Sequence, residues 1–123
     1  MSFMANVKIS KGSSRCVILV GKLAFKFPYT YSWKTFLNGL LANMQEVEFS
    51  QIKDWEEKLC PIKWYIPLGF LVIMPRVKVL EPHEMTREQL EDFCQIGDFK
   101  IPAEIKESSF GWLEGRLVAI DYG

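Results

Sequence analysis

Residues 115–123 read GRLVAIDYG. Gly115 closes a turn, and the apolar run Leu117 to Ile120 that follows is typical of a short buried strand. The run ends on Asp121, which is followed by an aromatic residue and a glycine. An acidic residue in this position commonly holds a metal ion or caps a loop. We therefore expect Asp121 to be a metal ligand or a loop cap whose partners come from earlier in the chain.

In the first part of the chain, apolar and polar residues alternate in a way that predicts three antiparallel strands. Gly21-Lys22 fits a two-residue hairpin turn between the second and the third strand. In the third strand, Phe25 and Phe27 alternate with Lys26. Because successive side chains of a strand point to opposite faces, Lys26 should lie on the face opposite the large apolar residues. The predicted strands are residues 7–9, 16–20 and 23–27.

A long helix is expected from about Ser32, its N-cap, to about Gln51. Glu48 falls within the apolar arc of this helix, whereas Glu46 falls on the opposite side and is expected in solvent. A carboxylate on the apolar face needs a partner, so we expect Glu48 to pair with a cation. The alternative is that Glu48 lies near the helix end and simply reaches water. The apolar arc consists of Trp33, Phe36, Leu37, Leu40, Leu41, Met44 and Val47.

The second half of the sequence predicts two further strands, a short helix and a C-terminal β-hairpin. The short helix should begin with a capping box of Thr86 and Gln89 and end at Gly97. The fold class is therefore α+β, with a five-stranded antiparallel sheet, one long helix on one face, a short helix and a C-terminal hairpin. The additional strands are residues 62–66, 70–74, 110–113 and 117–120.

The composition of the 123 residues narrows the function classes. Lys and Arg balance Asp and Glu, so a general nucleic-acid binder is not expected. His83 is the only histidine, which argues against histidine-based metal chemistry. The start, MSFMANVKIS, has no long apolar segment, so we expect no signal peptide or membrane span and a cytoplasmic location. Cys16, Cys60 and Cys94 lack metal-site spacing and are expected to be reduced, buried thiols.

The order of these elements resembles the small lobe of the protein-kinase and aminoglycoside-kinase-like fold, joined directly to that fold's metal-binding hairpin. AFKF resembles the strand that carries the kinase lysine, here Lys26, and the following helix resembles the helix of its partner glutamate, here Glu48. IDYG resembles the motif that holds magnesium through Asp121. GFLVIMPRV resembles the strand that leads into the nucleotide-binding hinge, with Met74, Pro75 and Val77 as the cofactor-binding residues. The resemblance implies a single kinase-like minimal domain, 1–80 small-lobe-like and 81–123 forming the short helix and hairpin.

The chain departs from the family's pattern in four places. It has no counterpart of the catalytic His-Arg-Asp loop, because His83 is followed by Glu84 and Met85. Ser109 stands where an asparagine ligand is expected, and the glycine-rich loop is reduced to Gly12 among serines. The helical large lobe has no counterpart. Phosphoryl transfer needs a positioned substrate, magnesium and a group that orients the attacking hydroxyl. Of the residues that supply these functions in the family, only the counterparts Lys26, Glu48 and Asp121 are present.

These departures favour a non-catalytic protein, similar to a pseudokinase, that acts by binding another protein. Small phage or prophage proteins can resemble it, which implies a phage or bacterial modulator of a host protein. The binding patch is expected to be aromatic, although most aromatic residues of such a chain are core residues. The alternatives are a minimal ATP- and magnesium-dependent phosphotransferase that uses Lys26, Glu48 and Asp121, and an unrelated small α+β protein. The candidate patch residues are Trp33, Trp55, Trp64, Tyr65 and Trp112.

Overall fold

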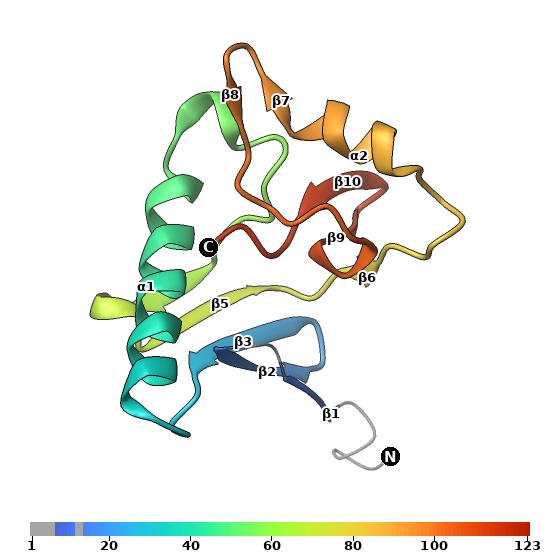
Figure 1. Cartoon of the computed structure of the whole chain (residues 1–123). Helices are drawn as coiled ribbons and strands as arrows, with labels where there is room; N and C mark the ends of the chain where they lie inside the picture. The colour runs from blue at the N-terminus through green and yellow to red at the C-terminus, as the bar shows by residue number, and fades with distance from the viewer. Residues whose placement is uncertain (1–6, 12–13) are drawn as a thin grey trace.

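The computed structural model describes residues 7–11 and 14–123, so the predicted loop glycine Gly12 lies outside the described residues (Figure 1). The largest sheet is antiparallel with the strand order β1-β2-β3-β5-β4. The α+β prediction with antiparallel sheets is confirmed, but the chain forms three sheets instead of one sheet and a separate hairpin. The strands of the largest sheet are β1 (Val7–Lys11), β2 (Arg15–Val20), β3 (Leu23–Pro28), β4 (Trp64–Ile66) and β5 (Leu71–Pro75).

The β2–β3 hairpin sets the direction of the polar side chains in this sheet. Its turn uses Gly21 with a φ of 57°, a left-handed conformation that glycine adopts without strain. Lys26 is paired with Val17 on β2 and Val72 on β5. The side chain of Lys26 is buried, whereas the neighbouring Phe25 is half-buried. The two residues therefore lie on opposite faces, as predicted, and it is the face of the lysine that is covered.

Helix α1 (Trp33–Ser50) covers this face. Ser32 is its N-cap, and the Ser32 hydroxyl accepts a hydrogen bond from the Thr35 amide. Gly39 allows a close approach to the sheet, because a Cβ atom there would lie 2.5 Å from the Ser14 carbonyl oxygen and 2.6 Å from Pro28 Cβ. The buried positions of the helix are Gly39, Asn43 and Glu46.

The predicted rotation of this helix is therefore wrong. Leu37, Leu41 and Met44, which the hydrophobic pattern placed in the core, are exposed. The reason is that the sheet face under α1 carries the buried cations Arg15 and Lys26, which attract the polar side of the helix. Of the apolar arc, Trp33, Leu37, Leu41 and Met44 are left exposed, whereas Phe36, Leu40 and Val47 are half-buried.

The remaining sheets lie in the second half of the chain. The three-stranded sheet has the order β10-β9-β6, and the β9–β10 hairpin turns at Glu114 and Gly115 with φ of 51° and 85°. The Thr86–Gln89 capping box is present at the start of α2 (Arg87–Cys94), but α2 ends at Cys94 and not at Gly97. The other strands are β6 (Lys78–Val79), β7 (Gln95–Ile96), β8 (Phe99–Lys100), β9 (Phe110–Leu113) and β10 (Arg116–Ala119), and the short 3₁₀ turns are η2 (Lys53–Trp55), η3 (Pro67–Gly69) and η4 (Glu107–Ser109).

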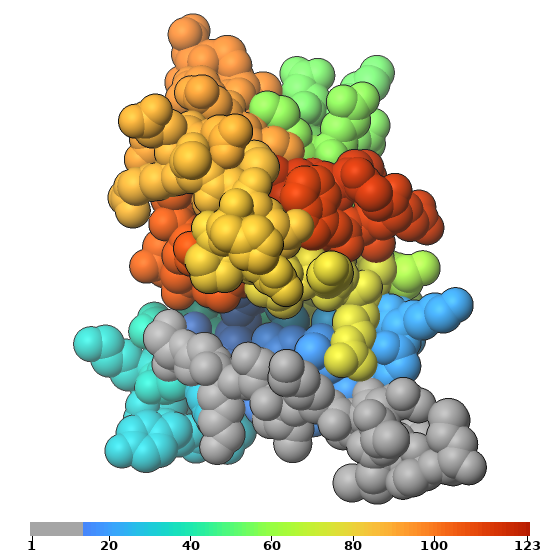
Figure 2. All heavy atoms as spheres, turned by 90° about the vertical axis from the view of Figure 1, so that its right-hand side faces the viewer, coloured from blue at the N-terminus to red at the C-terminus, as the bar shows by residue number. Residues whose placement is uncertain are grey.

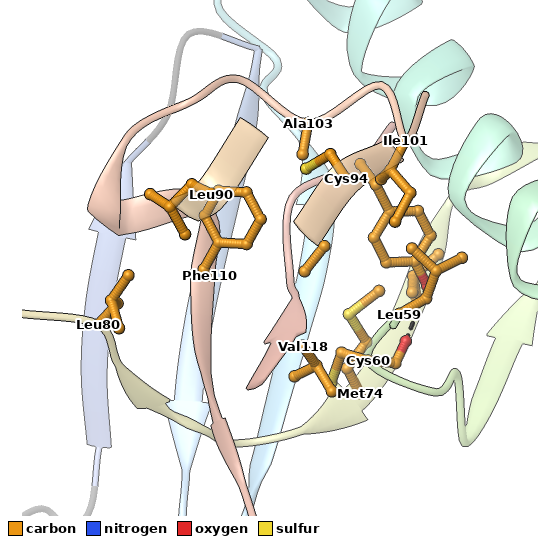
Figure 3. Packing of buried hydrophobic residues seen from close by; sticks show 13 residues of the cluster. Leu59, Cys60, Met74, Leu80, Leu90, Cys94, Ile101, Ala103, Phe110 and Val118 are labelled. Atoms are coloured by element: carbon orange, nitrogen blue, oxygen red, sulfur yellow. Dashed lines mark hydrogen bonds between the residues drawn. The ribbon is translucent and has the colours of Figure 1, made fainter. Parts of the chain in front are cut away.

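The buried residues of the hydrophobic core all come from the segment 59–122, and half-buried residues near the end of α1 pack against them (Figure 3). Figure 2 shows the orange and red C-terminal segments above the blue strands of the large sheet. The C-terminal part is also tied to the segment before β4, because the Cys60 amide donates to the Ala119 carbonyl at 2.8 Å. None of the helices in the described ranges combines the length and the apolar character needed to cross a bilayer. Fully buried core residues include Leu59, Cys60, Val72, Met74, Ile101, Phe110, Val118 and Tyr122.

Candidate functional site

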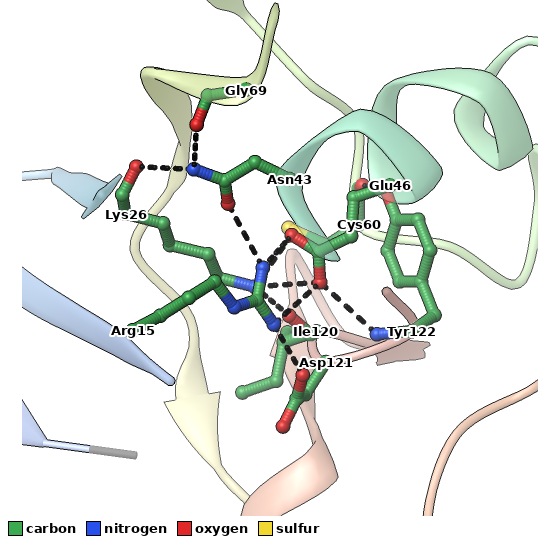
Figure 4. A network of polar contacts seen from close by, with 9 residues as sticks. All are labelled: Arg15, Lys26, Asn43, Glu46, Cys60, Gly69, Ile120, Asp121 and Tyr122. Atoms are coloured by element: carbon green, nitrogen blue, oxygen red, sulfur yellow. Dashed lines mark hydrogen bonds and ion pairs between the residues drawn. The ribbon is translucent and has the colours of Figure 1, made fainter. Parts of the chain in front are cut away.

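Four charged side chains from distant parts of the chain meet between α1 and the large sheet (Figure 4). Arg15 comes from the start of β2, Lys26 from β3, Glu46 from α1, and Asp121 from the segment after β10. Two cations therefore face two carboxylates. We call these four residues the ionic cluster.

Glu46 is at the centre of the ionic cluster and is fully buried. Its Oε1 lies 2.6 Å from Arg15 Nη1, and its Oε2 lies 3.1 Å from Lys26 Nζ. The backbone amide of Tyr122 also donates to Oε2, at 3.1 Å. Burial alone would raise the pKa of Glu46, but the charges of Lys26 and Arg15 and their hydrogen bonds outweigh burial and hold that pKa below its usual value. Glu46 is therefore an ionised carboxylate in the protein interior.

Glu48, the predicted partner of Lys26, does not pair with it; Glu46 takes that place. Glu48 is exposed, because it lies on the side of α1 that faces away from the sheet. The alternative for Glu48, contact with water near the helix end, describes its position. Two residues correspond to roughly 200° of rotation in an α-helix, so the change from Glu48 to Glu46 is a change of helix face.

Arg15 joins Glu46 to Asp121. Its Nη2 lies 2.5 Å from Asp121 Oδ1, and the Asp121 side chain is 48% exposed. Burial would lower the pKa of Arg15, but the charges of Glu46 and Asp121 and their hydrogen bonds raise it above its ordinary value. Asp121 therefore reaches the same cluster as Lys26 from the C-terminal segment, and its nearest partner there is a guanidinium group.

Asn43 supports the ionic cluster from α1. Its amide oxygen accepts from Arg15 Nη1 at 3.1 Å, and its amide nitrogen donates to the carbonyls of Lys26 and Gly69 at 3.2 and 2.9 Å. All of its polar atoms are thus used although the residue is fully buried. Asn43 holds Arg15 in place and links α1 to the turn after β4.

The sequence contains a signal for these missed residues. Gly39, Asn43 and Glu46 recur at the spacing of one helix face. Arg15 is an even number of residues before Val17, which pairs with Lys26, so both cations lie on the same face of the sheet. A search for polar residues at helical spacing opposite a strand with lysine would have identified the buried side of α1.

Residues 121–123 (DYG) hold the C-terminal segment against α1. Tyr122 is fully buried and its hydroxyl donates to the Cys60 carbonyl at 2.8 Å. A Cβ atom at Gly123 would lie 2.0 Å from the Ala42 carbonyl oxygen, so only glycine fits against α1. Burial raises the pKa of Tyr122 above its ordinary range, and it raises the pKa of the Cys60 thiol to about 11. Both groups are therefore neutral at physiological pH.

Of the predicted hinge residues, Met74 belongs to the core and Val77 packs against it. Met74 is fully buried and pairs with Ala24, and Pro75 is also buried. The Pro75 carbonyl accepts a weak hydrogen bond from the Cys60 thiol at 3.7 Å. The Val77 side chain is packed against β9, because a Cβ atom at Gly111 would lie 2.4 Å from Val77 Cγ2.

The residues around Asp121 make a poor magnesium site. Among the described residues, His, Cys, Asp and Glu side chains form no group of three or more that could hold a metal ion. The Asp121 carboxylate is already neutralised by Arg15. Ser109, at the place of the expected second ligand, is fully buried, and its hydroxyl has no hydrogen-bond partner in the described part of the chain. Magnesium is usually held by one or two carboxylates together with phosphate and water oxygens, and here the half-exposed carboxylate is already paired with a guanidinium group.

Three of the five aromatic residues predicted to form a patch are exposed. Trp33, Trp64 and Tyr65 are 78%, 56% and 40% exposed. Trp55 and Trp112 are instead half-buried against the core. Comparison of the chain with protein-family models, with curated proteins and with solved structures finds no match.

Proposed function

We propose that this protein is a non-catalytic relative of the kinase small lobe that acts by binding another protein. The observation that carries the proposal is the closure of the ionic cluster around Glu46. A nucleotide phosphate would need the charge of Lys26, and a magnesium ion would need Asp121. Lys26 is instead buried, with 6% of its surface exposed, and Asp121 is bound to Arg15.

Opening this cluster for a ligand would be costly. Lys26 and Arg15 are both nearly fully buried, with 6% and 8% of their surface exposed. Removing one partner of a buried ion pair typically costs about 3–5 kcal/mol, because the other charge remains without a partner. A phosphate that reached the buried Lys26, or a magnesium ion that displaced Arg15 from Asp121, would disturb these pairs and would have to offset a penalty of this kind. The cluster therefore supports a structural role for residues that in a kinase would contact ATP.

The surface proposed for the partner is the edge strand β4. Trp64, Tyr65 and Ile66 are all exposed, and the described chain places no strand on the outer side of β4. An open edge with large apolar side chains is the surface to which an extended segment of another chain adds as a further strand. We propose that the partner contributes such a segment, with apolar side chains that pack on Trp64 and Ile66.

A photo-crosslinking experiment tests this surface. A photoreactive phenylalanine analogue replaces Tyr65 in one variant and Phe99, which is 68% exposed in the β7–β8 hairpin, in a matched control. We expect a discrete adduct with one protein in lysate of the source organism from position 65 and none from position 99. The adduct should disappear when Trp64→Lys is added. Equal labelling from both positions, or adducts only between two copies of this chain, would contradict the proposal.

One observation favours the alternative, a minimal phosphotransferase. The half-exposed Asp121 carboxylate lies in the same cluster as Lys26 and Glu46. The deciding measurement is transfer of radiolabel from ATP in the presence of magnesium. We expect no transfer to the protein or to added substrates. Transfer that is lost on Asp121→Ala, but not on Glu48→Ala, would establish the alternative.

A further inference from the structure

Helix α1 presents an apolar stripe that no other described element covers. Trp33, Leu37, Leu41 and Met44 are 78%, 50%, 55% and 42% exposed. Figure 1 shows α1 at the outer margin of the molecule, and its inner side is occupied by the ionic cluster. Four large apolar residues at helical spacing normally mark the buried side of a helix. Here they mark a side of α1 that no other element of residues 7–11 and 14–123 covers.

The stripe continues onto the η3 turn. The Phe36 ring lies 6.1 Å from the ring of Trp33 and 6.3 Å from the ring of Phe70, so Phe36 connects the helix to the turn. Phe70 and Leu68 are 47% and 66% exposed. Leu68 has a φ of 68°, an uncommon conformation for a bulky residue. This backbone conformation accompanies an exposed leucine beside the stripe.

The size of this surface matches a protein–protein interface. If a large side chain has a total surface of about 150–250 Å², the exposed surface of the stripe and the turn adds up to roughly 700 Å². The six residues counted are Trp33, Leu37, Leu41, Met44, Leu68 and Phe70. The largest apolar patch on a typical monomer is about 300–600 Å², and a standard interface buries about 800 Å² on each partner. The stripe and η3 therefore supply most of one side of a dimer interface.

The charges at the two ends of the stripe indicate which partner fits. Lys34, Leu37, Leu41, Met44 and Glu48 follow one another at alternating steps of three and four residues, the spacing of a helix–helix seam. Lys34 and Glu48 are both exposed and carry opposite charges at opposite ends. A second α1 placed antiparallel on the first brings Lys34 of each copy toward Glu48 of the other. The surface is thus complementary to itself under two-fold symmetry.

We infer that the chain forms a two-fold symmetric dimer in which α1 packs antiparallel on the α1 of a second copy. The apolar stripe and η3 form the centre of the interface, and the Lys34–Glu48 pairs close it at both ends. The inference goes beyond the proposed function, because it rests on the side chains of α1 and η3 and not on the open backbone edge of β4. It also gives Glu48 a role at the surface.

Sedimentation velocity and light scattering on the full chain test the dimer at about 1 to 100 µM, the range of weak to moderate affinities. Lys34→Glu or Glu48→Lys alone places like charges together at both ends, so each should raise the dissociation constant of the dimer about tenfold. The double variant Lys34→Glu/Glu48→Lys restores opposite charges and should return the constant close to that of the wild type. Asp98→Lys, an equal change of charge in the β7–β8 hairpin, should leave it unchanged.

Leu41→Glu places a charge in the middle of the seam and should produce a monomer that remains folded by circular dichroism, since Leu41 is already half exposed. Trp64→Lys, in β4, should remain dimeric, which separates this inference from the proposed function. A wild-type chain that is monomeric over the whole concentration range would overturn the inference. So would a dimer whose stability is unaffected by Leu41→Glu, or a double charge swap no better than the single variants.

Discussion

The carboxylate of Glu46 on α1 lies 3.1 Å from the ammonium group of Lys26 on β3, and neither side chain is more than 7% exposed. The same carboxylate lies 2.6 Å from the Arg15 guanidinium. Two buried cations thus depend on one buried anion. Because of this dependence, we expect substitution of Glu46 to weaken the contact between α1 and the sheet more than substitution of any other residue of the helix.

Glu46→Gln should reduce the free energy of unfolding by about 3–5 kcal/mol, because Lys26 and Arg15 would remain buried without their carboxylate. Urea unfolding followed by circular dichroism measures the change. The matched control is Glu48→Gln on the same helix, which should change stability by less than about 0.5 kcal/mol. Equal effects of the two substitutions would show that α1 is rotated from the position described.

Stability should fall at acid pH because of Glu46. The pKa of Glu46 in the folded protein is lower than its ordinary value of 4.5, so its contribution is fully present above about that pH. The contribution is lost as the pH falls through the folded-state pKa, since the carboxylate must then be protonated. Urea midpoints measured between about pH 7 and pH 3 should decline below pH 4.5. The decline should be shallower in Glu46→Gln and retained in Glu48→Gln.

Gly39→Ala tests the close packing of α1 on the sheet. Alanine is the better helix former by about 1 kcal/mol, yet its Cβ would lie 2.5 Å from the Ser14 carbonyl oxygen. We expect a net loss of about 1–3 kcal/mol, because backbone atoms have to move. Asn38→Ala, at the exposed neighbouring position, should be neutral or raise stability by about 0.5 kcal/mol. A rise in the melting temperature of Gly39→Ala would show that α1 lies farther from the sheet.

The cysteines should resist thiol reagents in the native protein. Cys60 is fully buried and burial raises its pKa to about 11, so little of the reactive thiolate exists near neutral pH. Cys16 and Cys94 are buried as well. With an aromatic disulfide reagent at pH 8, absorbance should rise only at the rate of unfolding, whereas all 3 thiols should react at once in denaturant. Rapid labelling of Cys60 in the native state would show that the region around it opens readily.

The amino-acid sequence by itself determined the local elements of this protein. The hairpin turn at Gly21, the cap of α1 at Ser32 and the Thr86–Gln89 capping box are each specified by residues a few positions apart. Strand alternation also placed Lys26 on the correct face of its strand. These features depend on backbone geometry and neighbouring side chains, so they could be predicted without knowledge of the rest of the chain.

Only the tertiary structure decided which side of α1 is buried. The hydrophobic pattern located an apolar stripe, and the usual inference that such a stripe faces the core led to Glu48 instead of Glu46. That inference failed because the sheet beneath the helix carries Arg15 and Lys26, and two buried cations are stabilised only if carboxylates approach them. Arg15 lies 31 residues before Glu46 and 106 before Asp121 in the chain, so no local pattern relates them. Electrostatic pairing across these distances therefore set the rotation of the helix and left its apolar side exposed.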